Sequence, residues 1–218
     1  MPENVGADLR YAGWWLVTRF LYLVRHGAAD PHDGPLSEAG KEQARLTGQR
    51  LSGMPFSAIY HGPLPRAAQT AGLIADSLPG VPVSACDLAG DYLPSDPDPA
   101  HLPSRFASFL AGFSAAERAE GPARAVAALE RFAQGSDEPG EVYELVVTHN
   151  FLIGWIVSQT LDAPQWRWLG LNQMNCAVTI IAYAPGLPAS LIIFNDAGHL
   201  PPALRWTGFP AAVRPAHS

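Results

Sequence analysis

The pattern of apolar and polar residues predicts two buried strands that share one design. Residues 20–27 begin as an unbroken apolar run and end in Arg25, His26 and Gly27, and residues 142–148 form a second apolar run that His149 follows. Runs of this length without polar alternation are typical of central strands that helices cover on both faces. The chain therefore repeats one unit, in which a histidine stands at the end of a buried strand and a helical segment comes next.

The same periodicities, together with capping and turn residues, predict the other elements. Proline-containing residues 81–85 suit an edge strand, Ser37 suits a helix N-cap, and Pro65 suits a first helical turn. We expect strands at residues 20–27, 56–60, 81–85, 142–148, 176–184 and 191–195. We expect helices at residues 38–53, 65–78, 104–113, 121–134 and 151–161.

Four basic side chains fall at the predicted strand ends or at a helix start. Arg25 and His26 follow the first strand, His149 follows the fourth, and Arg66 opens the second helix. Open parallel sheets bind ligands at the carboxyl ends of their strands, and a helix N-terminus favours anions. We therefore expect these side chains to form a phosphate pocket.

The residue types in this pocket favour phosphoryl transfer through a histidine. Guanidinium groups match the geometry of phosphate oxygens, and a neutral imidazole offers a lone pair that can attack phosphorus. The attacking ring needs its other N–H held by an acceptor, for which a backbone carbonyl is expected. A metal site is disfavoured, because arginines repel a divalent cation and no carboxylate or thiol accompanies either histidine at ligand spacing.

Composition narrows the classes of partner. The chain has 218 residues, 48% hydrophobic and 16% charged, with a net charge of −6 and a pI near 5.6. We expect one domain over residues 1–218, with an N-terminal extension at 1–19 and an irregular tail at 199–218. The acidic balance argues against a general nucleic-acid binder. No apolar stretch reaches the roughly 18 residues of a spanning helix, so no membrane partner is expected.

The two cysteines suggest a cellular location. Cys86 and Cys176 fit neither a zinc spacing nor a disulfide framework. Because unpaired thiols are typical of a reducing compartment, we expect a cytoplasmic protein. Oligomeric state is left open by the sequence.

Four stretches, in order, resemble the histidine phosphatase superfamily, the phosphoglycerate mutase-like proteins. They are residues 23–27 (Leu-Val-Arg-His-Gly), 36–44, 61–71 and 146–149. The resemblance implies a three-layer α/β/α sandwich with a mostly parallel central sheet. It also implies a phosphohistidine on His26 and a phosphate held by Arg25, Arg66 and His149, with no metal or organic cofactor. The implied function is metal-independent hydrolysis of phosphate monoesters.

The proton donor departs from the commoner family pattern. Many members carry a glutamate after a leucine in the loop past the third strand, whereas this chain offers Asp91, with Asp87 in reserve. An unperturbed aspartate is ionised at neutral pH and could not protonate a leaving alcohol. A bound phosphate dianion would favour its protonated form, so the substrate itself would prepare the acid.

Further departures bear on substrate and reaction. Ala29, Asp30 and Asp33 stand where mutases carry Thr and Asn, which favours a phosphatase over a mutase. Asn150 replaces a glycine and could give its backbone N–H to phosphate, while His61 is either structural or a substrate contact. The alternatives are a phosphoglycerate mutase-type phosphotransferase and a catalytically weak phosphate-binding scaffold. The expected partner is a phosphorylated small molecule or a phosphoprotein.

Overall fold

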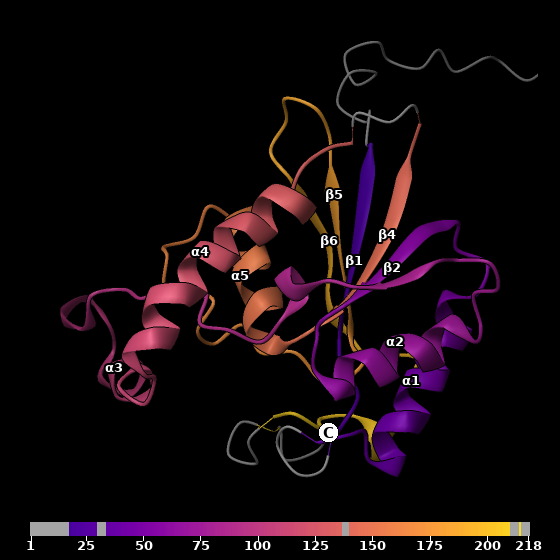
Figure 1. The fold of residues 1–218 in the computed structure, drawn as a ribbon, viewed down its shortest axis with the longest axis horizontal. Coiled ribbons are helices and arrows are strands. Elements are labelled where there is room, and N and C mark those ends of the chain that lie inside the picture. The colour runs from indigo at the N-terminus through magenta and orange to yellow at the C-terminus, as the bar shows by residue number, and fades with distance from the viewer. Residues whose placement is uncertain (1–17, 30–33, 137–139, 210–213, 215–218) are drawn as a thin grey trace, which may run out of the picture.

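The computed structural model describes residues 18–29, 34–136, 140–209 and 214, and these form one sheet flanked by helices (Figure 1). The strand order is β3-β2-β4-β1-β5-β6. The strands are β1 (Arg19–Arg25), β2 (Phe56–His61), β3 (Val83–Ala85), β4 (Val142–Thr148), β5 (Val178–Tyr183) and β6 (Ser190–Asp196). The first four are mutually parallel, whereas β5 is antiparallel to both β1 and β6. A mostly parallel sheet, with β3 at its edge, is thus confirmed.

Alternating side chains of the central strands build a core on each face of the sheet. Leu21 and Leu23 of β1 pack in a cluster with residues of α4 and α5, whereas Tyr22 and Val24 pack with residues of α1 and α2. The helices are α1 (Glu38–Leu51), α2 (Pro65–Ala75), α3 (Ser104–Leu110), α4 (Ala115–Phe132) and α5 (Asn150–Thr160). Figure 1 shows α4 and α5 on one side of the sheet and α1 and α2 on the other, which confirms the three-layer α/β/α architecture.

The first turn of α4 differs from the prediction. The helix begins at Ala115 and not at residue 121, because Ser114 and Glu117 form a reciprocal capping box and Pro122 is accommodated inside the helix. Its buried face includes the small Gly121, whose Cβ, if present, would lie 2.1 Å from the carbonyl oxygen of Leu93. The helix therefore lies close against the loop that carries Asp91.

Both ends of the chain differ in part from expectation. Residues 1–17 of the predicted extension lie outside the described residues, but Arg19 already belongs to β1 and pairs with Glu144, Nε to Oε2 3.3 Å. The described part of the tail, residues 199–209, contains a short 3₁₀ helix at Pro202–Leu204. It packs back on the domain, since Trp206 and Phe209 contact the cluster that contains Leu36 and Ala44.

Candidate active site

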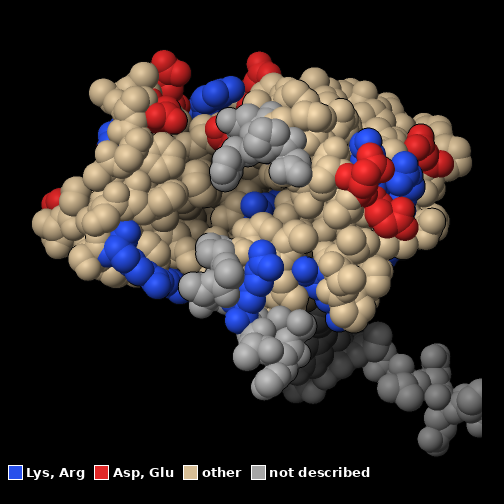
Figure 2. All heavy atoms as spheres, turned by 90° about the horizontal axis from the view of Figure 1, so that it is seen from below, with Lys and Arg blue, Asp and Glu red and all other residues tan. Residues whose placement is uncertain are grey.

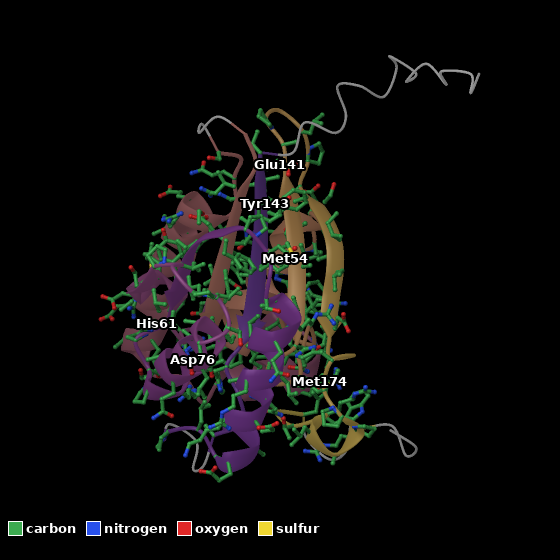
Figure 3. The ribbon with its side chains drawn as sticks, turned by 90° about the vertical axis from the view of Figure 1, so that its right-hand side faces the viewer. Met54, His61, Asp76, Glu141, Tyr143 and Met174 are labelled. Atoms are coloured by element: carbon green, nitrogen blue, oxygen red, sulfur yellow. The ribbon has the colours of Figure 1, made fainter. Side chains whose placement is uncertain are left out.

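The parallel pairing of β1 with β4 places both histidines at one end of the sheet. Arg25 lies opposite Thr148 in the register, so His26 and His149 follow side by side, with ring centroids 5.0 Å apart. The backbone N–H of His26 donates to the carbonyl of Thr148 at 2.9 Å. In Figure 3, Glu141 and Tyr143 mark the start of β4 at the upper end, and Met174 lies towards the opposite end. Seen from below in Figure 2, the surface is hollowed, and basic side-chain atoms are visible inside the hollow.

The imidazole of His26 is held in one orientation. Its Nδ1 lies 2.7 Å from the carbonyl oxygen of Gly27. A carbonyl only accepts, so Nδ1 carries the proton and Nε2 keeps its lone pair. Burial, followed by the nearby His149 and Arg25, lowers the pKa of His26 from 6.5 to about 2, so the ring is neutral at pH 7. A backbone carbonyl is the acceptor that the sequence analysis expected.

The turn after His26 is fixed by its neighbours. The N–H of Gly27 donates to Oγ1 of Thr70 at 3.0 Å, and the side chain of Asn175 donates to the His26 carbonyl at 2.7 Å. A Cβ at Gly27 would lie 2.5 Å from the carbonyl oxygen of Gly40, so only glycine allows α1 to approach this closely. Sequence reasoning did not single out Thr70 or Asn175.

Arg66 joins the two histidine-bearing tips to the loop after β3. Pro65 opens α2, which places the buried Arg66 in its first turn. Its Nε donates to Nε2 of His26 at 3.1 Å, and its Nη2 contacts Oδ2 of Asp91 at 2.9 Å. The same carboxylate oxygen lies 3.5 Å from Nδ1 of His149. These four side chains therefore converge.

The structure separates the two candidate proton donors. Asp91 is in contact with Arg66 and His149, and its side chain keeps 32% of its surface exposed. Asp87 is exposed in the 3₁₀ helix Asp87–Ala89, and its backbone carbonyl, not its carboxylate, accepts from Arg124. Asp91 is thus the better placed of the two.

Arg25 is anchored by backbone carbonyls. Its Nη1 donates to the carbonyl of Gln173 at 2.6 Å and to that of Gly208 at 3.2 Å. Burial lowers the pKa of Arg25 to about 10, although Asp91 opposes the shift, and the guanidinium stays charged at neutral pH. The sequence analysis missed both carbonyl acceptors that anchor Arg25, because backbone oxygens leave no side-chain motif.

Asn150 and His61 occupy different surroundings. Asn150 is the first residue of α5, where a backbone N–H has no partner within the helix. Its amide donates to Oδ1 of Asn172 and accepts from the N–H of Gln173 at 2.9 Å, so it also orients the segment that anchors Arg25. Nδ1 of His61 contacts the carbonyl of Gly62 at 2.8 Å. Figure 3 shows His61 well separated from Met174. The contact of His61 with substrate stays a prediction.

Two further observations concern metals and membranes. Within the described ranges, no group of three or more His, Cys, Asp or Glu side chains could hold a metal ion. None of the helices in the same part of the chain combines the length and apolar character that crossing a bilayer requires. Asp30 and Asp33, on which the sequence analysis based its preference for a phosphatase over a mutase, lie outside the described residues.

Comparison with known proteins identifies relatives over most of the chain. The model of the histidine phosphatase superfamily (branch 1) matches residues 21–88 and 100–196. The mitochondrial serine/threonine-protein phosphatase PGAM5 of Mus musculus is 31% identical over 196 residues, which is 85% of this chain and 65% of that protein. The Homo sapiens protein of the same name is also 31% identical, with the same coverage. This chain thus spans about 65% of the length of these relatives.

Solved structures share the fold. YhfR of Bacillus stearothermophilus has a TM-score of 0.64 at 22% identity, covering 84% of this chain and 99% of that one. The phosphoglycerate mutase of Plasmodium falciparum has a TM-score of 0.59 at 21% identity, covering 85% and 95%. These likenesses support the architecture of the sheet and its two helical layers.

The expected cytoplasmic location is wrong, because the curated relatives are mitochondrial proteins. Unpaired cysteines indicate a reducing environment, but they do not identify the compartment of the cell. The four motifs, the sheet order and the matched ranges agree with one another. Since the family model covers well over half of the chain, this protein belongs to the histidine phosphatase superfamily.

Proposed function

We propose that this chain is a phosphatase that hydrolyses phosphate monoesters through a phosphohistidine on His26, without a metal ion. The observation that carries the proposal is the state of His26: a buried imidazole with Nδ1 bonded to the Gly27 carbonyl and Nε2 directed at Arg66. The ring is neutral at pH 7 and lies beside two guanidinium groups. This is the arrangement that an attacking imidazole and a dianionic phosphoryl group require.

In the first step, Nε2 of His26 attacks phosphorus and forms an N–P bond. The bond from phosphorus to the ester oxygen breaks, and its electron pair stays on the leaving oxygen, which takes a proton from the carboxyl of Asp91. Arg25, Arg66 and His149 stabilise charge on the phosphoryl oxygens, with the N–H of Asn150 as a further donor. The Nδ1–H bond to Gly27 stabilises the positive charge that the ring acquires.

In the second step, water attacks the phosphorus of the phosphohistidine. The carboxylate of Asp91 takes a proton from this water, and the N–P bond breaks with its electron pair returning to Nε2. Inorganic phosphate is released, and both His26 and Asp91 return to their starting protonation states. No further reactant is needed.

The contact between Arg66 and Asp91 supports a second candidate, a phosphate-binding scaffold with weak catalysis. At 2.9 Å the guanidinium favours the ionised carboxylate, which cannot donate a proton. A phosphoryl group would compete for the same N–H donors of Arg66 and would bring negative charge next to Asp91. Phosphate binding with no turnover would favour the scaffold.

The substrate class follows the relatives in part. The curated relatives are named serine/threonine-protein phosphatases, so phosphoproteins are the first substrates to test, followed by phosphorylated small molecules. The phosphoglycerate mutase alternative predicts phosphoryl transfer between the hydroxyls of phosphoglycerate. We expect hydrolysis in its place.

Hydrolysis of 4-nitrophenyl phosphate in the presence of EDTA tests the proposal. We expect turnover by the unaltered chain, loss to background in His26→Ala, and no loss in His101→Ala, a matched change at an exposed histidine. Brief incubation with radiolabelled substrate should leave an acid-labile, base-stable label on the protein that His26→Ala lacks. Equal turnover in His26→Ala and the unaltered chain would refute the mechanism.

A further inference from the structure

We infer that aromatic side chains next to Asp91 form a subsite for the leaving group, so that the enzyme prefers phosphomonoesters of apolar alcohols. This inference rests on the proposed function, in which Asp91 protonates the leaving oxygen. Whatever the oxygen is attached to must then lie on the same side of the site as Asp91. The surroundings of Asp91 therefore determine which alcohols fit.

A pocket of about 390 Å³ opens at Asp91. Its apolar walls are Leu64 at the start of α2, Tyr92 next to Asp91, and the rings of Phe113 and Phe151. Phe151 follows Asn150 in the first turn of α5, two residues after His149. The wall thus continues directly from the backbone that presents the candidate phosphate site.

The aromatic surface extends beyond this pocket. Phe151 also lines a second recess of about 390 Å³, together with Phe106, Phe109 and Trp168. The centroid of the Phe151 ring lies 5.1 Å from that of Trp168, 5.9 Å from Phe109 and 6.2 Å from Phe113. Phe109 keeps 45% of its surface exposed. Exposed rings in continuity with a reaction site offer apolar contact to a substrate.

Charges at the rim disfavour an anionic alcohol. Glu117 and Glu120 of α4 line the Asp91 pocket, and Arg124 is the basic residue among its lining side chains. Arg124 lies over the ring of Tyr92, 5.2 Å from its centroid. A carboxylate on the alcohol would meet more negative than positive charge here and would be repelled. An uncharged alkyl or aryl group would meet no such repulsion.

A series of straight-chain alkyl phosphates, from ethyl to hexyl, isolates this contact. Primary alcohols leave with nearly the same basicity, so the demand on Asp91 is constant and only the apolar area varies. Full burial of a methylene is worth roughly a fourfold change, and a half-open groove about twofold. We therefore expect kcat/KM to rise about 15-fold from ethyl to hexyl phosphate.

Two variants assign the effect to the aromatic surface. Phe113→Ala, which removes a ring that lines the Asp91 pocket, should flatten the rise of kcat/KM with chain length. Phe194→Ala, which removes an exposed phenylalanine on β6, should leave the rise unchanged. Equal kcat/KM for ethyl and hexyl phosphate would overturn the inference and leave the phosphatase proposal standing. Absence of hydrolysis for every ester, with 4-nitrophenyl phosphate included, would overturn the proposed function itself.

Discussion

Gln43 is a buried side chain whose replacement should loosen the candidate site from a distance. Its Oε1 accepts from the N–H of Ala28, in the loop after His26, at 2.8 Å. Its Nε2 donates to the carbonyl of Leu204 at 2.8 Å and to Oγ1 of Thr207 at 2.7 Å. One amide on α1 thus joins the loop after the predicted nucleophile to the tail that reaches Arg25.

Gln43→Met keeps the volume of the side chain and removes these three hydrogen bonds. The backbone partners are only half-buried, so each loss should cost about 1 kcal/mol, at the lower end of the range for unsatisfied groups. The free energy of unfolding should fall by about 3 kcal/mol, and Tm by roughly 6–12 °C for a chain of this size. We also expect KM for phosphate esters to rise, because Thr207 precedes the residue whose carbonyl orients Arg25.

Urea unfolding followed by circular dichroism measures the loss as a shift in midpoint at constant slope. Gln49→Met, an exposed change on the same helix, is the control and should cost less than about 0.5 kcal/mol. If Gln43→Met were no more destabilising than Gln49→Met, the hydrogen bonds of Gln43 to the loop after His26 and to the tail would contribute nothing to the stability of the fold.

Three further predictions concern charge. The folded pKa of His26, about 2, lies below its unfolded value of 6.5, so the unfolded chain binds more protons between these limits and stability falls as pH falls. Between pH 7.5 and 5.0, protonation of His26 in the unfolded chain should lower the free energy of unfolding by about 2 kcal/mol. Urea unfolding should show no such loss from this group in His26→Asn. Asp91→Asn should lower kcat for alkyl phosphates by about 10²–10⁴-fold, and less for 4-nitrophenyl phosphate, whose leaving group needs no acid; equal losses for both would contradict the role. Glu144→Gln leaves the guanidinium of Arg19 buried without its ion pair, so the free energy of unfolding should fall by about 3 kcal/mol while kcat is unchanged. A variant as stable as the unaltered chain would show that the ion pair is dispensable.

The strands and their tips were predictable because their signal is local and strong. The apolar runs at β1 and β4 matched the observed bounds to within two residues, and parallel pairing then brought His26 and His149 together. The start of α4 was misplaced because the prediction rested on the spacing of apolar residues in the second half of the helix, whereas the capping box at Ser114 is a weaker signal in sequence. Pro122 lies inside α4, beyond its first turn, so a proline does not by itself fix where a helix begins.

The anchors of Arg25 and the tie through Gln43 could not be predicted. Both depend on contacts between residues more than a hundred positions apart, and several of the partners are main-chain oxygens that every residue possesses. The tail after Gly198 is rich in proline and was expected to be irregular, yet its residues Trp206 and Phe209 pack on the cluster that contains Ala44 of α1. Only the folded arrangement reveals such roles.

The hydrogen bonds that hold Arg25 affect how strongly the candidate phosphate site attracts an anion. Gln173 and Gly208 offer it neutral dipoles, which fix the guanidinium in place without cancelling its unit charge. Arg66, in contrast, shares its charge with a carboxylate. The two arginines are therefore unequal. Arg25 presents its full positive charge to any approaching dianion, whereas Arg66 does so only after the dianion has displaced the carboxylate of Asp91.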